Sequence, residues 1–194
     1  MKRFDGRVAI VTGAGSGLGR ATAKLFASEG ATVACLDLAL EAAEETAKVA
    51  RDAGGKARAY KVDVSDPKSA HDAVAAAAKD LGRPVILVNS AGTGKFARAH
   101  ETSFEDWTRI IGVNLTGSFL MAKEVLPHMV ERKAGAIVNL GSNSPRGTMR
   151  LPYAASKGGV FAITTSLALE TATLGIRINC VAPHWSDCED PDHR

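Results

Sequence analysis

The chain of 194 residues has only three cysteines, Cys35, Cys180 and Cys188, and they are widely spaced. So few thiols do not support a disulfide-bonded scaffold, and we expect a reducing, cytoplasmic setting. Zinc is disfavoured as well, although Cys180, His184, Cys188 and His193 could be drawn as ligands. Cys180 falls in an apolar run typical of a strand, and the spacing matches no common zinc module. We therefore expect no metal site.

Charge of one sign and long apolar runs are also scarce. The 24 basic and 21 acidic residues leave a net charge of +3, which gives no reason to expect nucleic acid or an anionic membrane as a partner. No apolar run approaches the roughly 20 residues of a membrane span, and the first residues do not resemble a signal peptide. Hydrophobic residues make up 45% of the chain and aromatic residues 5%, which is typical of a globular domain.

The sequence does contain a regular alternation of short apolar runs and longer amphipathic stretches. The predicted strands are Val8–Thr12, Thr32–Asp37, Ala57–Val62, Val85–Asn89, Ala136–Leu140 and Ile176–Val181. The predicted helices are Leu18–Ser28, Glu41–Ala53, Pro67–Asp80, Phe104–Arg132 and Tyr153–Leu174. Most of the strand-like runs are apolar at successive positions, so both faces of each strand should be covered by helices. The pattern predicts one α/β domain over residues 1–183, a doubly wound parallel sheet in three layers.

Glycines follow most of the predicted helices. Gly30, Gly82, Gly135 and Gly175 occupy such positions, where we expect a left-handed residue that ends the helix. Residues 184–194, in contrast, have no helical or strand periodicity and form a polar tail.

Glycine is concentrated between the first predicted strand and the first predicted helix. The sequence there is Thr12-Gly13-Ala14-Gly15-Ser16-Gly17-Leu18-Gly19. A turn of this kind lets the backbone approach a pyrophosphate, which the N-terminus of a helix attracts. The usual G-x-G-x-x-G spacing is absent, and no Lys-Ser/Thr pair follows, which excludes a nucleoside-triphosphate loop. We predict a dinucleotide phosphate loop that uses Gly13, Ser16, Gly17, Leu18 and Gly19.

Asp37 closes the second predicted strand, about twenty residues after the glycine loop. A carboxylate there can accept hydrogen bonds from the ribose hydroxyls of an adenosine and repels a 2′-phosphate. No Arg or Lys adjoins Asp37 or lies in the middle of the loop. NAD is therefore favoured over NADP, although a polar residue at the end of a strand can also be merely structural.

Tyr153 and Lys157 are four residues apart in a predicted helix, so they lie on one face of it. A tyrosine hydroxyl has an unperturbed pKa of about 10, and a neighbouring ammonium favours its deprotonated form. Ser142 follows the strand Ala136–Leu140, which places it at the same edge of the sheet as the glycine loop. Its hydroxyl can hydrogen-bond a substrate oxygen, and Ser144 is the alternative for this role.

Taken together, these residues resemble the classical short-chain dehydrogenase/reductase family, from about residue 5 to residue 183. Further matches are Asn89-Ser90-Ala91-Gly92, Asn114 and the run Arg177-Ile178-Asn179-Cys180-Val181-Ala182-Pro183. The resemblance implies that Tyr153 is the general acid/base and that Lys157 assists it and binds the nicotinamide ribose. It implies that Ser142 orients the substrate oxygen and that Asn114 holds a water. The further cofactor contacts that it implies are Asp63, Val64, Asn89, Ala91, Gly92 and Pro183, although Asn89 can also serve to tie strands together.

The implied activity is NAD-dependent hydride transfer between nicotinamide and a secondary alcohol or ketone. The stretch from Pro145 to Val160 is similar to the benzoate cis-diol dehydrogenases, which suggests a ring alcohol or cis-diol as substrate. After Pro183 the family has a Gly, a Thr, a covering helix and a seventh strand, none of which this sequence contains. We therefore expect a sheet without the family's last strand.

The same residues allow two other functions, and the long helices predict self-association. The chain could be a truncated member that binds a dinucleotide with weak or no activity, or an NADP-dependent 3-oxoacyl-carrier reductase. The stretches Phe104–Arg132 and Tyr153–Leu174 are apolar around much of their circumference. We therefore expect a homodimer or homotetramer.

Overall fold

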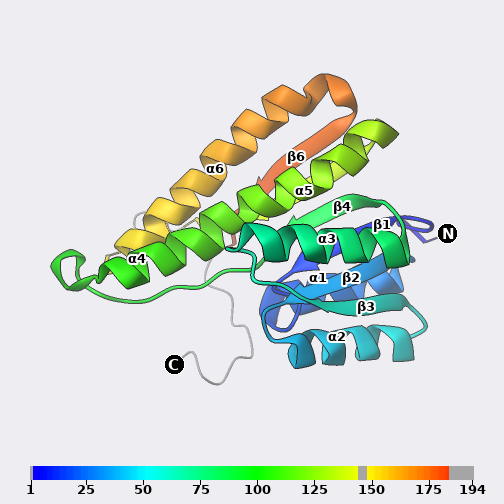
Figure 1. The fold of residues 1–194 in the computed structure, drawn as a ribbon, viewed down its shortest axis with the longest axis horizontal. Helices are drawn as coiled ribbons and strands as arrows, with labels where there is room; N and C mark the ends of the chain where they lie inside the picture. The colour runs from blue at the N-terminus through cyan, green and yellow to red at the C-terminus, as the bar shows by residue number, and fades with distance from the viewer. Residues whose placement is uncertain (1, 144–147, 184–194) are drawn as a thin grey trace.

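The structure is a computed structural model, which describes residues 2–143 and 148–183. Over these residues six parallel strands form one sheet in the order β3-β2-β1-β4-β5-β6 (Figure 1). The strands are β1 Val8–Thr12, β2 Thr32–Asp37, β3 Lys56–Lys61, β4 Pro84–Asn89, β5 Gly135–Leu140 and β6 Ile176–Val181. The α-helices are α1 Gly17–Ser28, α2 Leu40–Asp52, α3 Pro67–Leu81, α4 Phe104–Ile111, α5 Gly117–Arg132 and α6 Leu151–Thr171. The predicted doubly wound α/β sheet is confirmed.

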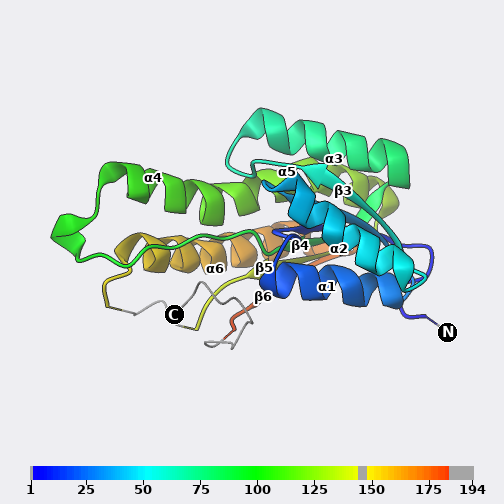
Figure 2. The ribbon, with the colours of Figure 1, turned by 90° about the horizontal axis from the view of Figure 1, so that it is seen from below.

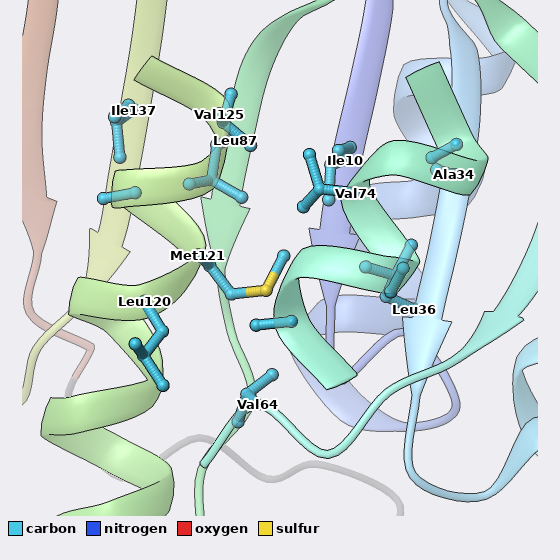
Figure 3. Close-up of a cluster of buried hydrophobic side chains, with 14 of the residues drawn as sticks. Ile10, Ala34, Leu36, Val64, Val74, Leu87, Leu120, Met121, Val125 and Ile137 are labelled. Atoms are coloured by element: carbon cyan, nitrogen blue, oxygen red, sulfur yellow. The ribbon is translucent and has the colours of Figure 1, made fainter. Parts of the chain in front are cut away.

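Helices cover both faces of the sheet, as the view from below in Figure 2 shows. On one face, buried alanines of α1 and α2 pack against Val11, Val33 and Cys35. On the other face, α3, α5 and α6 pack against the alternate residues of the same strands. Met121 of α5 lies at the centre of this second cluster, between Leu87 and Leu36 (Figure 3). Burial of apolar surface on both faces is what holds the three layers together.

Side chains at the helix starts explain why two of the helices begin where they do. The carboxylate of Asp66 accepts hydrogen bonds from the backbone N–H groups of Lys68 and Ser69, just ahead of Pro67 in the first turn of α3. Ser103 caps α4 in the same way through the N–H of Asp106. Such caps satisfy N–H groups that have no partner within the helix.

One helix ends differently from the prediction. The left-handed residue after α5 is Lys133, with φ of 50°, whereas Gly135 is the first residue of β5. A Cβ at Gly135 would lie only 2.4 Å from the sulfur of Met129. Gly135 is thus needed for close packing of β5 against α5 and not for the turn.

The predicted helix over residues 104–132 is continuous but not uniform. Gly112–Thr116 forms a π-helical segment between α4 and α5. The wider turn inserts an extra residue into the helix, a feature often found at functional sites. It contains Asn114, one of the candidate site residues.

Candidate active site

The glycine loop and the loop after β4 meet where the order of strands reverses, between β1 and β4. The hydroxyl oxygen of Thr12 accepts hydrogen bonds from the backbone N–H groups of Ser90 and Ala91, both at 3.1 Å. A Cβ at Gly13 would lie 2.9 Å from the backbone of Ala91. In doubly wound sheets, ligands bind outside the carboxyl ends of the strands at this reversal.

The start of α1 is tightly folded on one side and open to solvent on the other. A Cβ at Gly19 would lie 2.1 Å from the carbonyl oxygen of Gly13, so the loop folds tightly over the first helical turn. Gly17 has a φ of +49° and open space where a Cβ would point. Ser16 precedes the helix without capping it through its side chain, and Ser16, Gly17 and Leu18 are exposed. Uncapped N–H groups beside open space fit an anionic phosphate.

Asp37 is fixed by the glycine loop. One carboxylate oxygen accepts a hydrogen bond from the N–H of Gly15 at 2.8 Å, and the other accepts from the N–H of Ala39 at 3.0 Å. Sequence reasoning missed Arg20, whose guanidinium donates a hydrogen bond to the carbonyl oxygen of Gly15 at 2.5 Å. The sequence signal for this contact was that Arg20 follows Ser16 by about one helical turn, which keeps its side chain near the glycine loop.

Asp63 and Val64 follow β3 at the same edge of the sheet. A carboxylate oxygen of Asp63 accepts hydrogen bonds from the N–H of Ser65 at 2.9 Å and from its hydroxyl at 2.6 Å. Val64 is buried against Gly117 at the start of α5. A shallow surface depression of about 470 Å³ runs from Leu38 past Asp63 and over α3. It borders the expected adenine end of the site, while the catalytic candidates are grouped around α6.

Tyr153 and Lys157 lie in the first two turns of α6. The ammonium nitrogen of Lys157 is 5.7 Å from the centroid of the Tyr153 ring and donates a hydrogen bond to the carbonyl oxygen of Leu140 at 2.6 Å. The Lys157 residue is only 6% exposed. Burial lowers its pKa from 10.5 to about 8, because a buried charge loses its hydration.

The π-helical segment brings Asn114 to the same place. Its side-chain oxygen accepts from the N–H of Thr93 at 2.8 Å, and its amide nitrogen donates to the Thr93 carbonyl at 2.9 Å. The same nitrogen donates to the Ser156 hydroxyl at 3.0 Å, and that hydroxyl donates to the Tyr153 carbonyl at 2.7 Å. A Cβ at Gly92 would lie 3.5 Å from the Asn114 oxygen and 3.9 Å from the Lys157 nitrogen. Asn114 therefore joins the loop after β4 to α6.

Ser142 is buried just beyond β5, where the chain runs beside the end of β6. The N–H of Gly141 donates to the Val181 carbonyl at 2.8 Å, and the N–H of Asn143 donates to the Pro183 carbonyl at 3.4 Å. Pro183 is thus placed at the same edge of the sheet. The alternative serine, Ser144, and the tail 184–194 with His184, Cys188 and His193 lie outside the described residues.

Asn89 is directed into the fold, as the structural alternative suggested. Its amide nitrogen donates to the side-chain oxygen of Asn139 at 2.9 Å and to the carbonyl of Ser118 at 3.1 Å. Asn139 in turn donates to the Thr164 hydroxyl at 2.9 Å. These buried bonds link β4, β5 and α6 beneath the site. A contact of Asn89 with a cofactor stays a prediction.

Comparison with known proteins decides the family. The family model described as short chain dehydrogenase matches residues 7–189. The chain belongs to the short-chain dehydrogenase family. Members of this family are oxidoreductases that act on CH–OH groups of alcohols or the corresponding ketones and use NAD(P).

Individual short-chain dehydrogenases match nearly the whole chain. It is 42% identical over 183 residues to D-threitol dehydrogenase of Mycolicibacterium smegmatis, covering 93% of this chain and 70% of that protein. It is 39% identical to a 3-oxoacyl-[acyl-carrier-protein] reductase of Thermotoga maritima, covering 93% of this chain and 74% of that protein. A solved structure of a candidate short-chain alcohol dehydrogenase from Sinorhizobium meliloti superposes with a TM-score of 0.93 at 34% identity, covering 97% of this chain and 76% of that one.

The described residues contain neither a membrane-spanning helix nor a metal-binding cluster. No helix within residues 2–143 and 148–183 is long and apolar enough to cross a bilayer. The same residues contain no group of three or more His, Cys, Asp or Glu side chains arranged to hold a metal ion.

Proposed function

We propose that this short-chain dehydrogenase is an NAD-dependent oxidoreductase that transfers hydride between nicotinamide and a secondary alcohol or ketone. The observation that carries the proposal is the contact of the Lys157 ammonium with the Tyr153 ring, beside Gly92 and the glycine loop. We assign to Lys157 the role of compensating negative charge on the Tyr153 oxygen during proton transfer.

In the oxidation direction, the deprotonated hydroxyl of Tyr153 takes the proton of the substrate hydroxyl. The Ser142 hydroxyl donates a hydrogen bond to the substrate oxygen, while Lys157 supplies the compensating positive charge. NAD, which the glycine loop and Lys157 would hold, would supply the acceptor for the hydride from the carbinol carbon. The product is a ketone, and reduction runs the same steps in reverse.

Asp37 supports NAD over NADP, because a carboxylate bonded to the glycine loop would repel a 2′-phosphate bound there. D-Threitol carries vicinal hydroxyl groups, and the dehydrogenase of that name supports a diol as substrate here. Within this class we propose a secondary alcohol, with a ring cis-diol among the candidates. The second candidate function is an NADP-dependent 3-oxoacyl-carrier reductase, which the Thermotoga maritima relative favours. Tighter binding of NADPH than of NADH would support that candidate.

The test uses the chain's two tyrosines as a matched pair. Tyr153→Phe is expected to bind NADH within about threefold of the wild type but to lose about 10²–10⁴-fold in turnover. Tyr60→Phe is the control, because it removes from β3 a hydroxyl that donates a hydrogen bond to Asp80 of α3. NADH binding is followed by fluorescence and turnover by absorbance with secondary alcohols, vicinal diols and ring cis-diols. Retained turnover in Tyr153→Phe would overturn the proposal, and wild-type binding without turnover would favour a weakly active or inactive dinucleotide-binding member.

We also propose that the chain forms a homodimer or homotetramer through its long helices. Phe119 and Val130 on α5 are 48% and 41% exposed, and Phe161 and Leu169 on α6 are 37% and 77% exposed. Apolar residues of this size on neighbouring helices favour contact with a second copy. Light scattering coupled to gel filtration tests this, and a monomer at micromolar concentration would contradict it.

A cytoplasmic setting stays part of the proposal, since Cys35 and Cys180 are free thiols.

A further inference from the structure

Gly15 of the glycine loop is held at both of its backbone polar atoms by side chains of opposite charge. Its N–H donates to the Asp37 carboxylate at 2.8 Å, and its carbonyl oxygen accepts from the Arg20 guanidinium at 2.5 Å. The carboxylate and the guanidinium are therefore separated by the backbone of a single residue. The Arg20 guanidinium therefore lies close to the Asp37 carboxylate, which is expected to face the adenosine ribose.

Arg20 has capacity for a further partner. It lies on α1, where its N–H donates to the carbonyl of Ser16 at 2.9 Å, so it is one turn above the exposed end of the loop. Its guanidinium reaches the Glu45 carboxylate of α2 only at 3.4 Å, and the Glu45 side chain is 67% exposed. The Nε atom of Arg20 is buried without a hydrogen-bond partner among the described residues. An exposed ion pair of this kind contributes little and is readily exchanged for a better acceptor.

We propose that Arg20 is a specificity-determining residue, which opposes Asp37 in the choice between NAD and NADP. The proposal rests on dinucleotide binding as proposed above. Asp37 repels the 2′-phosphate of NADP, whereas Arg20 is the group that binds this phosphate when the carboxylate charge is removed. A phosphate monoester carries about −1.5 to −2 charges near neutral pH, and a guanidinium can bind it with two parallel hydrogen bonds.

Glu45 is the competitor for Arg20 in this arrangement. The guanidinium lies between the Gly15 carbonyl and the Glu45 carboxylate. A chain with an uncharged residue 37 should bind NADPH through Arg20, and more tightly still if Glu45 is also uncharged. The cofactor preference therefore depends on three side chains and not on Asp37 alone.

The experiment measures the dissociation constants of NADH and NADPH by fluorescence for the wild type and four variants. Asp37→Asn is expected to bind NADPH at least tenfold more tightly than the wild type. Adding Arg20→Gln should weaken NADPH binding at least fivefold more than NADH binding, whereas Arg20→Lys in the same background should retain part of the gain. Adding Glu45→Gln to Asp37→Asn should tighten NADPH binding about two- to fivefold. Circular dichroism verifies that each variant is folded.

Three results would overturn the inference. These are an Asp37→Asn variant with no gain for NADPH, an Arg20→Gln substitution that weakens both dinucleotides equally, and an NADPH affinity of Asp37→Asn that varies with salt no more than its NADH affinity. The salt series needs no second substitution, so the third result can overturn the inference even if Arg20→Gln does not fold. A wild type that binds neither dinucleotide would instead overturn the proposed function itself.

Discussion

The ammonium nitrogen of Lys157 is held between the ring of Tyr153, 5.7 Å from its centroid, and the carbonyl oxygen of Leu140, 2.6 Å away. The first contact is within α6, and the second joins α6 to the end of β5. Position and protonation of this nitrogen therefore depend on the packing of a helix against the sheet. Because the residue is nearly fully buried, its charge costs free energy in the folded chain.

Replacing Lys157 with methionine should change the free energy of unfolding in a pH-dependent way. The folded-state pKa is about 8 and the ordinary value 10.5. Below pH 8 both states are protonated and the folded wild type bears the full cost of burying the charge. Between pH 8 and 10.5 the unfolded wild type binds more protons, so its stability rises with pH relative to Lys157→Met.

Urea denaturation of both proteins at several pH values measures this effect. At pH 7 Lys157→Met should have a higher free energy of unfolding than the wild type. This difference should fall by roughly 2–3 kcal/mol by pH 10.5. Loss of the hydrogen bond to the Leu140 carbonyl lowers the free energy of unfolding of the variant by about 1 kcal/mol at every pH. A stability difference that does not change between pH 7 and 10.5 would contradict the pKa of about 8.

Asn114→Leu should disconnect the loop after β4 from α6. The substitution leaves the N–H and carbonyl of Thr93 without the partner they have in the wild type. We expect the free energy of unfolding to fall by about 2–3 kcal/mol. Turnover should fall further than cofactor binding, because the loop that Asn114 holds through Thr93 continues into Gly94, which lies beside the Tyr153 ring. A Cβ at Gly94 would be only 3.6 Å from that ring.

The control for Asn114→Leu is Thr116→Ala in the same π-helical segment, where the side chain is exposed. It should change stability by less than about 0.5 kcal/mol. Equal effects of the two substitutions on stability and turnover would show that Asn114 contributes nothing specific to the site.

The fold could be predicted because its strands and helices differ so clearly in the length and period of their apolar residues. Each predicted strand agrees with the structure to within one residue at either end. The glycine loop and Ser142 could be assigned to one edge of the sheet because the carboxyl ends of parallel strands meet there. Their roles in binding and catalysis stay predictions.

Features that depend on contacts between distant residues could not be predicted. The π-helical segment depends on the bonds of Asn114 to Thr93 and Ser156, residues 21 and 42 positions away. The hydrogen bond from Arg20 to Gly15 depends on the conformation of a long side chain, which the spacing of residues in the sequence does not indicate. The left-handed Lys133 was missed because packing against Met129, not turn chemistry, requires glycine at 135.

Asn139→Leu and Thr164→Val test the buried bonds beneath the site. Asn139 donates to the Thr164 hydroxyl and accepts from Asn89, and all three residues are buried. Each single substitution leaves a buried polar group unpaired and should cost about 1–3 kcal/mol. The double variant should cost at least 0.5 kcal/mol less than the combined single effects. Strict additivity in urea denaturation would indicate that the two side chains do not act as one network.

Alanine at two glycines of the loop should separate folding from binding. A Cβ at Gly19 would lie 2.1 Å from the Gly13 carbonyl oxygen, so Gly19→Ala forces the backbone apart and should cost more than 2 kcal/mol in stability. A Cβ at Gly17 meets nothing within 4 Å, and only its φ of +49° is unfavourable, at about 1–2 kcal/mol.

Gly17→Ala should therefore remain folded yet lose NADH affinity by at least tenfold, because its methyl group points into the open space where the pyrophosphate is expected. Thermal denaturation and NADH fluorescence measured on the same samples give both quantities. Gly6→Ala is the matched control, since Gly6 also has a positive φ of +70° with open space around it but lies before β1. If Gly17→Ala bound NADH as tightly as Gly6→Ala does, the start of α1 would not be the phosphate site.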